Sequence, residues 1–299
     1  MAKLPNPVDF AVPVFILLIL IEMIWARGNA PEKYEPRDTL VSLVFGLGST
    51  VAGLIFGGAI YGLMLWLWEH RLATVPWTWW AWIACFVLDD LLYYLFHRSA
   101  HRIRWFWASH VNHHSSQHYN LSTALRQTWT GWLAMSFLFK LPLAAIGFHP
   151  AMILFCGGVN LIYQFWIHTE VIKRFPRWFE AVMNTPSHHR VHHATNPRYL
   201  DSNYAGVFIV WDRMFGTFVP EVDEEPIRYG IVRQLGTFNL LYSVFHEWIG
   251  IAKDLWQAPW RHKLSYLWRQ PGWSHDGSRD TSDTIKARWL ARQAAGPAE

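Results

Sequence analysis

Long apolar runs constrain the fold of this 299-residue chain more than any other feature. A helix needs about 20 apolar residues to cross a bilayer, where backbone groups must find their partners within the segment. Five runs approach or exceed this length: Phe10–Ala26, Leu40–Trp68, Pro76–Phe96, Trp129–Phe148 and Pro150–Ile167. We therefore predict an all-α, polytopic membrane bundle of about four to five spans.

The first two runs need closer inspection. The first could belong to a signal peptide, because Lys3 precedes its apolar core. However, Glu22 interrupts it, no small-residue cleavage site follows, and Arg27 comes next, so we favour a retained span. Asp38 or Thr39 could cap the second helix, whose glycines would permit a bend or close helix packing.

Composition supports a membrane protein and argues against nucleic acid. Charged residues make up 16% of the chain, below the ~25% of soluble domains. The 20 tryptophans suit a protein that meets the headgroup layer. A net charge of +4 without a basic binding motif does not indicate a nucleic-acid partner. Cys85 and Cys156 lie in apolar runs and cannot form a disulfide framework.

Two histidine clusters indicate a metal site. They hold nine of the sixteen histidines, namely His97, His101, His110, His113 and His114, then His188, His189, His192 and His193. The pattern H-x-x-H-H occurs in both clusters, as HVNHH and HRVHH. Residues three or four apart share a helix face, so each motif can present imidazoles to one or two neighbouring metals. Imidazole suits iron, zinc, copper and nickel, whereas a lone histidine would more often be an ordinary core or surface residue.

Other polar residues fall near these clusters. Asp90, Tyr94, His97 and His101 form one helical stripe at the end of the third run. Asp90 could orient a ligating imidazole, or could equally be an interfacial carboxylate at a helix end. His168 ends the fifth run four residues after Gln164, which makes it a further candidate ligand.

The charges predict the topology. His97 and His168 can share one side of the membrane if the turn at 147–150 lies on the other side. Basic residues gather on the histidine side, at Arg98, Arg102, Arg104, Lys173, Arg174 and Arg177. The positive-inside rule then places the metal site on the cytoplasmic face, as a histidine-rich helical cap, and the N-terminus outside.

We expect three regions: N-terminal membrane helices (1–75), a catalytic domain (76–220), and an interfacial helix with a polar tail (221–299). In the catalytic domain, Phe175–Asn184 looks amphipathic, and Asn203–Phe218 could pack over the cluster. Leu240–Trp256 suits an interfacial helix because charged residues interrupt it. The tail from Pro271 is polar and expected to be mobile.

The ligand set favours redox catalysis on a lipid. Structural zinc sites close with four ligands, commonly including cysteine, whereas these histidines exceed the needs of one metal. Two metals with an open position each fit the count better. An apolar chain offers little to acid–base chemistry, so oxidation by O₂ at the metals is the reaction that such a site suggests.

The motifs HRSAH, HVNHH, QFWIHTE and NTPSHHRVHH resemble the membrane-bound fatty acid hydroxylase/sterol desaturase superfamily. The resemblance covers about Asp89 to Phe218, and YNLSTALRQ, NYAG and WDRMFGTF are similar to its alkylglycerol monooxygenase branch. It implies a non-haem centre of two iron ions (Fe²⁺/Fe³⁺). The implied ligands are His97, His101, His110, His113, His114, His168, His189, His192 and His193.

Five residues of this chain differ from, or lie outside, the family patterns. Gln164 stands where other members carry a histidine, and His188 precedes the pattern as a supporting residue rather than a ligand. The alkylglycerol branch has a glutamate and an acidic pair where this chain has Arg102 and Gln117-His118. The resemblance therefore leaves ether-lipid specificity open. The electron donor is also open, between a separate protein and a small reductant such as a tetrahydropterin.

We predict a monooxygenase that hydroxylates a C–H bond of a sterol, fatty acyl or ether lipid. Residues expected to support the ligands or position the substrate are Asp90, Tyr94, Asn112 and Tyr204. One alternative is a desaturase on the same di-iron core, which only product analysis would distinguish. Another is a histidine-rich metal transporter or sensor, which would distribute its ligands along a transmembrane path.

Overall fold

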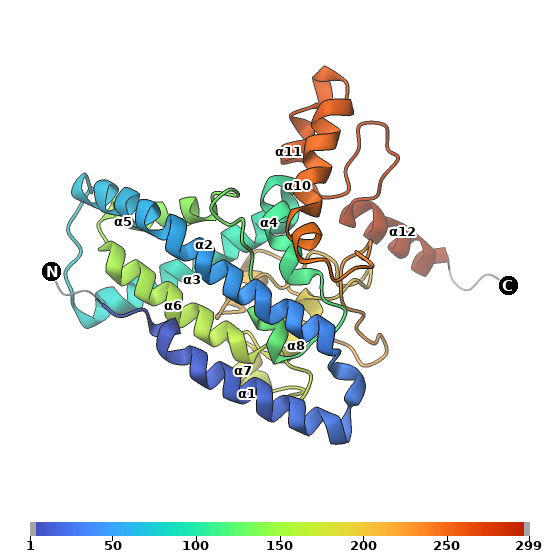
Figure 1. The fold of residues 1–299 in the computed structure, drawn as a ribbon, viewed down its shortest axis with the longest axis horizontal. Helices are drawn as coiled ribbons and strands as arrows, with labels where there is room; N and C mark the ends of the chain where they lie inside the picture. Colours follow the sequence, from blue (N-terminus) through green and yellow to red (C-terminus); the bar gives the residue numbers. More distant parts are fainter. Residues whose placement is uncertain (1–3, 296–299) are drawn as a thin grey trace.

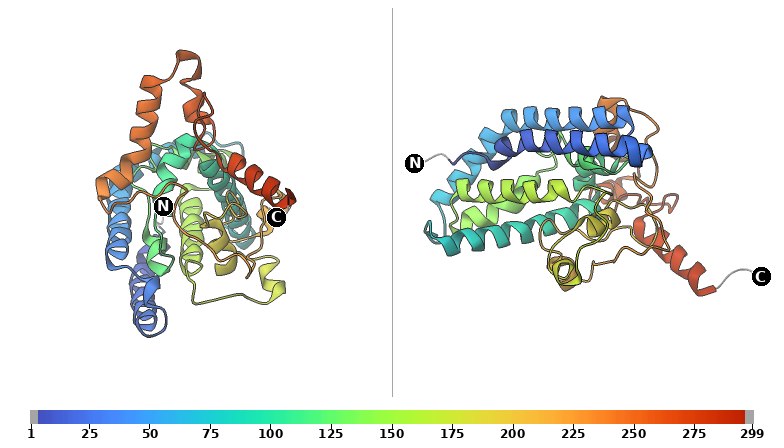
Figure 2. Two further views of the ribbon diagram at one scale, coloured as in Figure 1. Left: turned by 90° about the vertical axis from the view of Figure 1, so that its right-hand side faces the viewer. Right: turned by 90° about the horizontal axis from the view of Figure 1, so that it is seen from below.

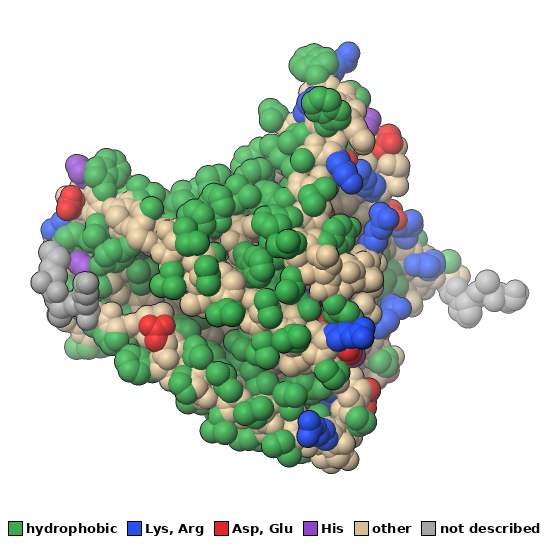
Figure 3. All heavy atoms as spheres, viewed as in Figure 1, with side chains coloured by type: hydrophobic (Ala, Val, Ile, Leu, Met, Phe, Trp, Pro, Cys, Tyr) green, Lys and Arg blue, Asp and Glu red, His purple; other side chains and the backbone are tan. Residues whose placement is uncertain are grey.

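The computed structural model describes residues 4–295, and a bundle of apolar helices forms its body. Within these residues three helices are long and apolar enough to cross a membrane: α1 (Pro7–Asn29), α2 (Pro36–Glu69) and α3 (Trp79–Arg102). The shorter α6 (Pro150–Trp166) packs against α1, α2 and α3 (Figure 1). Figure 3 shows apolar side chains over the broad face of this bundle, as expected for a surface in contact with lipid.

The first apolar run is an integral part of the bundle. Asn6 caps α1 by accepting a hydrogen bond from the Val8 backbone N–H at 3.1 Å. Farther along, Phe15 stacks on Phe165 of α6 with ring centroids 3.9 Å apart. This contact fixes α1 against the helix that leads to His168.

The N-terminal cap of α2 differs from the prediction. Its cap is Glu35, whose carboxylate accepts from the Asp38 backbone N–H at 2.5 Å. Asp38 lies inside the first turn and is buried, because its own carboxylate pairs with Arg126. The long-range ion pair, which the local sequence does not reveal, takes Asp38 away from a capping role.

The fourth apolar run, predicted as a span over Trp129–Phe148, is not a continuous helix. It contains turns, a 3₁₀-helix η3 (Ser136–Lys140) and the short α5 (Leu141–Ile146). Met135 has a φ of 57°, in the left-handed region, which is incompatible with a continuous helix through this residue, and Lys140 pairs with buried Asp89 of α3. Irregular backbone is tolerated at membrane depth where it is buried against protein. This segment packs on α2, where Trp129 Nε1 donates to Phe45 O at 3.0 Å.

A polar cap lies at the end of the bundle reached by α3 and α6 (Figures 1 and 2). It contains α4 (Arg104–His114), η2 (Leu121–Leu125), α7 (Arg177–Glu180), α8 (Pro186–His192) and α9 (Val210–Met214). The amphipathic segment predicted over Phe175–Asn184 thus forms little more than one helical turn. The short η1 (Pro31–Lys33) joins α1 to α2 at this same end.

The C-terminal region is largely helical up to Ala295, and the last four residues of the tail predicted from Pro271 lie outside the described residues. It forms α10 (Leu240–Gln257), η4 (Trp260–His262), α11 (Ser265–Trp268) and α12 (Ser282–Ala295). The first turn of α12 is held by the Arg102 guanidinium, which donates two hydrogen bonds of 2.7 Å to Asp283. The ion pair with α3 accounts for the order that composition alone did not predict.

Candidate metal centre

The nine histidines predicted as ligands come together in two adjacent groups. Within each group one ring nitrogen per residue lies within 4.8 Å of the others. The five-histidine group contains His97, His101, His110, His114 and His192. The four-histidine group contains His113, His168, His189 and His193. Such convergence of imidazole nitrogens is typical of transition-metal sites.

Four segments deliver these side chains. The last turns of α3 carry His97 and His101, and the last turns of α4 carry three more histidines. His168 follows the end of α6, and α8 with its C-terminal cap supplies the remaining three. The centre therefore forms where the membrane helices α3 and α6 meet the short helices of the cap.

The two H-x-x-H-H motifs contribute to the groups in a crossed manner. His110 and His114 belong to the five-histidine group, whereas His113 between them belongs to the four-histidine group. In the second motif His189 and His193 join the four-histidine group, and His192 joins the other. Residues four apart share one direction on a helix, while the residue three after the first points slightly aside. Each motif thus serves both groups.

The nitrogens within each group approach one another closely. In the five-histidine group, His110 Nε2 lies 2.9 Å from His97 Nε2 and 3.2 Å from His114 Nε2. In the four-histidine group, His168 Nε2 lies 3.0 Å from His189 Nε2 and 3.2 Å from His113 Nε2. Several Nε2 atoms thus point at a common centre, which is the arrangement that a shared cation requires.

Hydrogen bonds on the outer side of the rings leave nitrogens free for metal. His97 Nδ1 lies 2.7 Å from Tyr204 O, and His168 Nδ1 lies 2.7 Å from Gln164 O. His192 Nδ1 is 3.0 Å from Ser202 O, while its buried Nε2 has no partner among the described residues. An imidazole that donates Nδ1–H to a carbonyl presents the Nε2 lone pair inward, the usual state of a metal ligand. The residues therefore fit a pair of metal ions.

Burial keeps the imidazoles outside the spans neutral. It lowers the pKa of His168 to about 4. Burial together with the neighbouring histidines lowers the pKa values of five further ligands well below 6.5: His110, His114, His189, His192 and His193. Burial and nearby His168 likewise lower the pKa of His113. Neutral imidazole is the form that binds metal, so the pocket is ready to do so at neutral pH.

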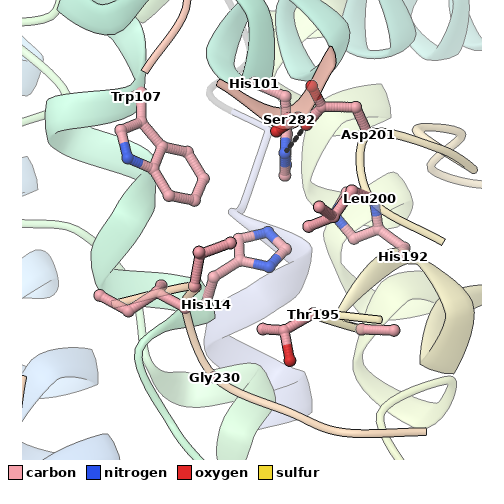
Figure 4. A pocket seen from close by; sticks show the side chains of 12 residues that line it. His101, Trp107, His114, His192, Thr195, Leu200, Asp201, Gly230 and Ser282 are labelled. Atoms are coloured by element: carbon pink, nitrogen blue, oxygen red, sulfur yellow. Dashed lines mark ion pairs between the residues drawn. The ribbon is translucent and has the colours of Figure 1, made fainter. Parts of the chain in front are cut away.

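A small cavity of about 70 Å³, with a lining of mixed polarity, touches the five-histidine group from the side of the cap. Figure 4 shows His101, His114 and His192 around it, with Trp107 at one wall and the first residue of α12, Ser282, at the rim. Asp201 Oδ1 lies 3.6 Å from His101 Nδ1, and its other oxygen accepts from Arg102 at 3.2 Å. Asp201 was absent from the sequence prediction, since nothing in its local sequence marks it.

A much larger apolar cavity of about 740 Å³ reaches both histidine groups from the bundle. Its wall includes His110 of the five-histidine group, and His113 and His168 of the four-histidine group. The rest of the wall is mostly apolar and comes from α1, α2, α3, α6 and the segment after α4: Val8, Val12, Phe15, Ile16, Leu43, Leu47, Phe96, Leu125, Leu161 and Phe165. An apolar chain can therefore reach the ligands from the membrane-facing side.

Asp90 and Tyr94 hold the loop after Ser202 in place. The Asp90 carboxylate accepts from the backbone N–H groups of Val207 and Phe208 at 2.8 and 3.0 Å, and from Trp211 Nε1 at 2.9 Å. These donors, rather than a ligating imidazole, orient the carboxylate. Tyr94 Oη lies 3.0 Å from Thr217 Oγ1. The loop in turn places Tyr204 O beside His97 Nδ1. Asp90 therefore positions His97 indirectly, by holding this loop.

The other predicted supporting residues differ in their contacts. The Tyr204 ring centroid lies 5.3 Å from that of His101. Asn112 is buried, and neither polar atom of its side chain has a partner among the described residues. Gln164 lines the apolar cavity and donates to Asn160 Oδ1 at 2.6 Å. His188 stands outside both groups, 4.0 Å from the Glu180 carboxylate, and burial lowers its pKa to about 4.

A buried ion pair between Arg126 and Asp38, at the end of α4, was not predicted from the sequence. The Arg126 guanidinium donates to Asp38 Oδ1 at 3.0 Å, to Asn112 O at 3.1 Å and to Ser115 Oγ at 3.0 Å. It therefore satisfies the C-terminal end of the helix that carries three ligands and ties that end to α2. Arg126 falls within YNLSTALRQ, which was noted as a motif but not assigned a role.

Comparisons with known proteins agree with this geometry. Residues 82–217 match the model of the fatty acid hydroxylase family. Alkylglycerol monooxygenase of Danio rerio is 40% identical over 281 residues, which cover 91% of this chain and 61% of that protein. The Homo sapiens protein of the same name gives the same identity, aligned length and two coverages. Ornithine lipid hydroxylase OlsE of Rhizobium tropici is 27% identical over 132 residues, covering 44% of this chain and 40% of that protein.

The similarity has two limits. The chain spans about 61% of the length of the two alkylglycerol monooxygenases. No solved structure matches the chain significantly.

Proposed function

The chain belongs to the fatty acid hydroxylase superfamily, in the branch of the alkylglycerol monooxygenases, and we propose that it is a membrane-bound, non-haem di-iron monooxygenase. In this proposal it hydroxylates a C–H bond of a lipid-like substrate with O₂. The apolar cavity that leads to ligands of both histidine groups carries the proposal. It would accept a hydrocarbon chain and exclude bulk water from the bond to be oxidised.

The nine histidines would hold two iron ions, one in each group. When bound, these ions supply the O₂ chemistry that side chains cannot provide. The reaction converts the substrate C–H, O₂, two electrons and two protons into an alcohol and water. The electrons would come from a separate donor protein or a small reductant such as a tetrahydropterin. The small cavity beside His101 and Trp107 would give such a reductant access on the side away from the lipid.

The distribution of charge supports a cytoplasmic metal site. Lysine and arginine side chains gather along the cap end of the molecule in Figure 3, whereas Arg71 lies at the far end of α2. By the positive-inside rule this end faces the cytoplasm. The N-terminal end of α1 would then lie on the opposite side of the membrane, because α1 runs toward the cap (Figure 1).

Two other functions make different predictions. A desaturase would use the same centre and cavity to remove two hydrogens, so its product would contain no oxygen from O₂. A metal transporter would have ligands arranged along a path across the bilayer, whereas these nine histidines gather at one depth beside an apolar cavity. The geometry therefore favours oxidation of a lipid.

The test is to incubate the iron-loaded protein in lipid nanodiscs with reductant and ¹⁸O₂, followed by lipid mass spectrometry. The printed names of the most similar relatives make alkylglycerols the first substrates to try, followed by fatty acyl lipids and sterols. We expect one ¹⁸O atom per product, loss of product in His113→Ala, and retention in His188→Ala. A product that has two hydrogens fewer than the substrate and contains no ¹⁸O would instead establish the desaturase.

A further inference from the structure

Residues 240–268, which comprise α10, η4 and α11, form a helical hairpin that stands out from the body of the protein. The hairpin projects across the direction of the bundle helices, beside the cap, in Figure 1, and it also stands out in the left view of Figure 2. A segment in this position lies parallel to the bilayer plane and at the level of the membrane surface if α1, α2 and α3 cross the membrane.

One face of α10 holds the hairpin to the body. Ser243, Val244, Ile251 and Asp254 are buried and recur at helical spacing. The buried Arg104 of α4 donates to Glu247 Oε1 at 2.6 Å and to Asp254 Oδ2 at 2.5 Å. The hairpin is therefore fixed to the same helix that carries three metal ligands.

A second face of the hairpin is apolar and exposed. Along α10 it comprises Leu241, Phe245, Ile249 and Trp256, spaced so that they share one side of the helix. The stripe continues through η4 and α11 with Trp260, Leu264 and Trp268, which are 79%, 71% and 60% exposed. Such a continuous apolar surface with several tryptophans is unusual for a face in water and suits the headgroup region.

The charged side chains of the hairpin favour a membrane with anionic lipids. Its two acidic residues, Glu247 and Asp254, are engaged by Arg104, and Asp254 also by Arg279. The remaining Lys, Arg, Asp and Glu side chains of residues 240–268 are all basic: Lys253, Arg261 and Lys263. In Figure 3 apolar side chains lie on the bundle side and tip of the hairpin, whereas basic side chains lie on its outer side.

We propose that this hairpin docks on the surface of an anionic bilayer, in the leaflet nearest the metal centre. Its apolar stripe enters the boundary between headgroups and acyl chains, and its basic side chains meet the lipid phosphates and carboxylates. Through Arg104 the docked hairpin anchors α4, and with it the polar side of the metal centre, at a fixed depth. The proposal does not depend on the reaction that the centre catalyses.

Site-specific fluorescence can test the docking in the full-length chain. Cys85 and Cys156 are buried, so a surface cysteine can be labelled selectively with an NBD maleimide. Trp256→Cys places the label on the apolar stripe, where residue 256 is 86% exposed. Asp223→Cys is the matched control, because its side chain is 84% exposed on the polar cap.

The nanodiscs contain about 30% phosphatidylserine, an anionic lipid, together with lipids whose acyl chains carry a nitroxide quencher. We expect the label at position 256 to show blue-shifted emission and strong quenching, and the label at position 223 to show neither. Quenching should weaken in neutral phosphatidylcholine discs and in a Lys253→Glu/Arg261→Glu variant. Equal quenching of the two labels would overturn the proposal. A blue shift without lipid quenching, with energy transfer between labelled copies, would also overturn it in favour of a protein–protein contact.

Discussion

The imidazole rings of His114 and His193 stack with centroids 4.4 Å apart and an interplanar angle of 24°, although the two residues belong to different groups. His113 and His193, which share a group, have ring centroids 4.7 Å apart. The two groups are therefore immediate neighbours, as the proposed binuclear centre requires. Sites of this kind can hold two metals close enough to act on one reacting molecule.

The crossed use of the H-x-x-H-H motifs predicts which double variants lose which metal. His113→Ala/His114→Ala removes one ligand from each group, so we expect both metals to be depleted. His113→Ala/His193→Ala removes two ligands from the four-histidine group alone and should leave about one metal per chain. Metal analysis of the purified variants distinguishes the cases. Equal depletion in both double variants would contradict the assignment of residues to the two groups.

Removal of Arg126 should destabilise the protein strongly. Arg126→Ala would leave Asp38 as a buried, unpaired charge and the end of α4 unsatisfied, with an expected loss of about 3–5 kcal/mol. Arg126→Lys keeps the charge, but a single ammonium group cannot bind several acceptors as the planar guanidinium does. We therefore expect this variant to regain only part of the lost stability. Thermal unfolding in nanodiscs gives the measurement.

Arg174→Ala is the control for that series, because its pair with Asp223 is largely exposed and should contribute about 0–1 kcal/mol. Similar losses of stability in Arg126→Ala and Arg174→Ala would show that the buried pair does not hold α4.

Asp201 should tune the metal affinity of the five-histidine group through His101. Its φ of 52° suits asparagine as well, so Asp201→Asn removes the charge without forcing the backbone to change. Loss of a carboxylate that supports a ligating histidine typically lowers metal affinity by about 10–100-fold. A chelator competition assay should show this loss, together with an altered absorption spectrum of the iron form.

Asp283→Asn provides the comparison, since it cuts the Arg102 contact to α12 but leaves Asp201 beside His101. We expect near-normal metal affinity in that variant. An equal loss in Asp283→Asn would assign the effect to α12 rather than to Asp201.

The metal-free protein should lose stability on acidification. Burial lowers the pKa of folded His168 and His188 to about 4, whereas an unfolded histidine titrates near ~6.5. Between these values the unfolded chain binds more protons than the folded one, so the free energy of unfolding falls as pH falls from about 6.5 toward 4. Melting temperatures of the metal-free protein, measured from pH 7.5 to 5, should therefore decrease. A flat profile would contradict the burial of neutral imidazoles.

Local patterns predicted the ligands because imidazole spacing is a short-range property. All nine histidines converge in the two groups and His188 lies outside them, whereas their binding of metal stays a prediction. Their division into two groups could not be predicted, because it depends on how α4 and α8 face each other. The same is true of Asp201 and Arg126, whose partners are far away in the sequence.

Hydropathy predicted the membrane helices but not the fourth apolar run. Segment 129–148 is apolar enough to span, yet Lys140 pairs with Asp89 and Met135 adopts a left-handed conformation. Both features depend on tertiary contacts that hydropathy does not contain. The order of α12 likewise depends on one long-range pair, between Arg102 and Asp283.

The most direct test of the central claim is the iron content of the purified full-length chain after anaerobic reconstitution with Fe²⁺. We predict about two irons per wild-type chain, and near-complete loss in His113→Ala/His192→Ala, which removes one ligand from each group. His188→Ala should retain both irons. One iron or none in the wild-type chain, or full iron content in the double variant, would contradict a binuclear histidine centre.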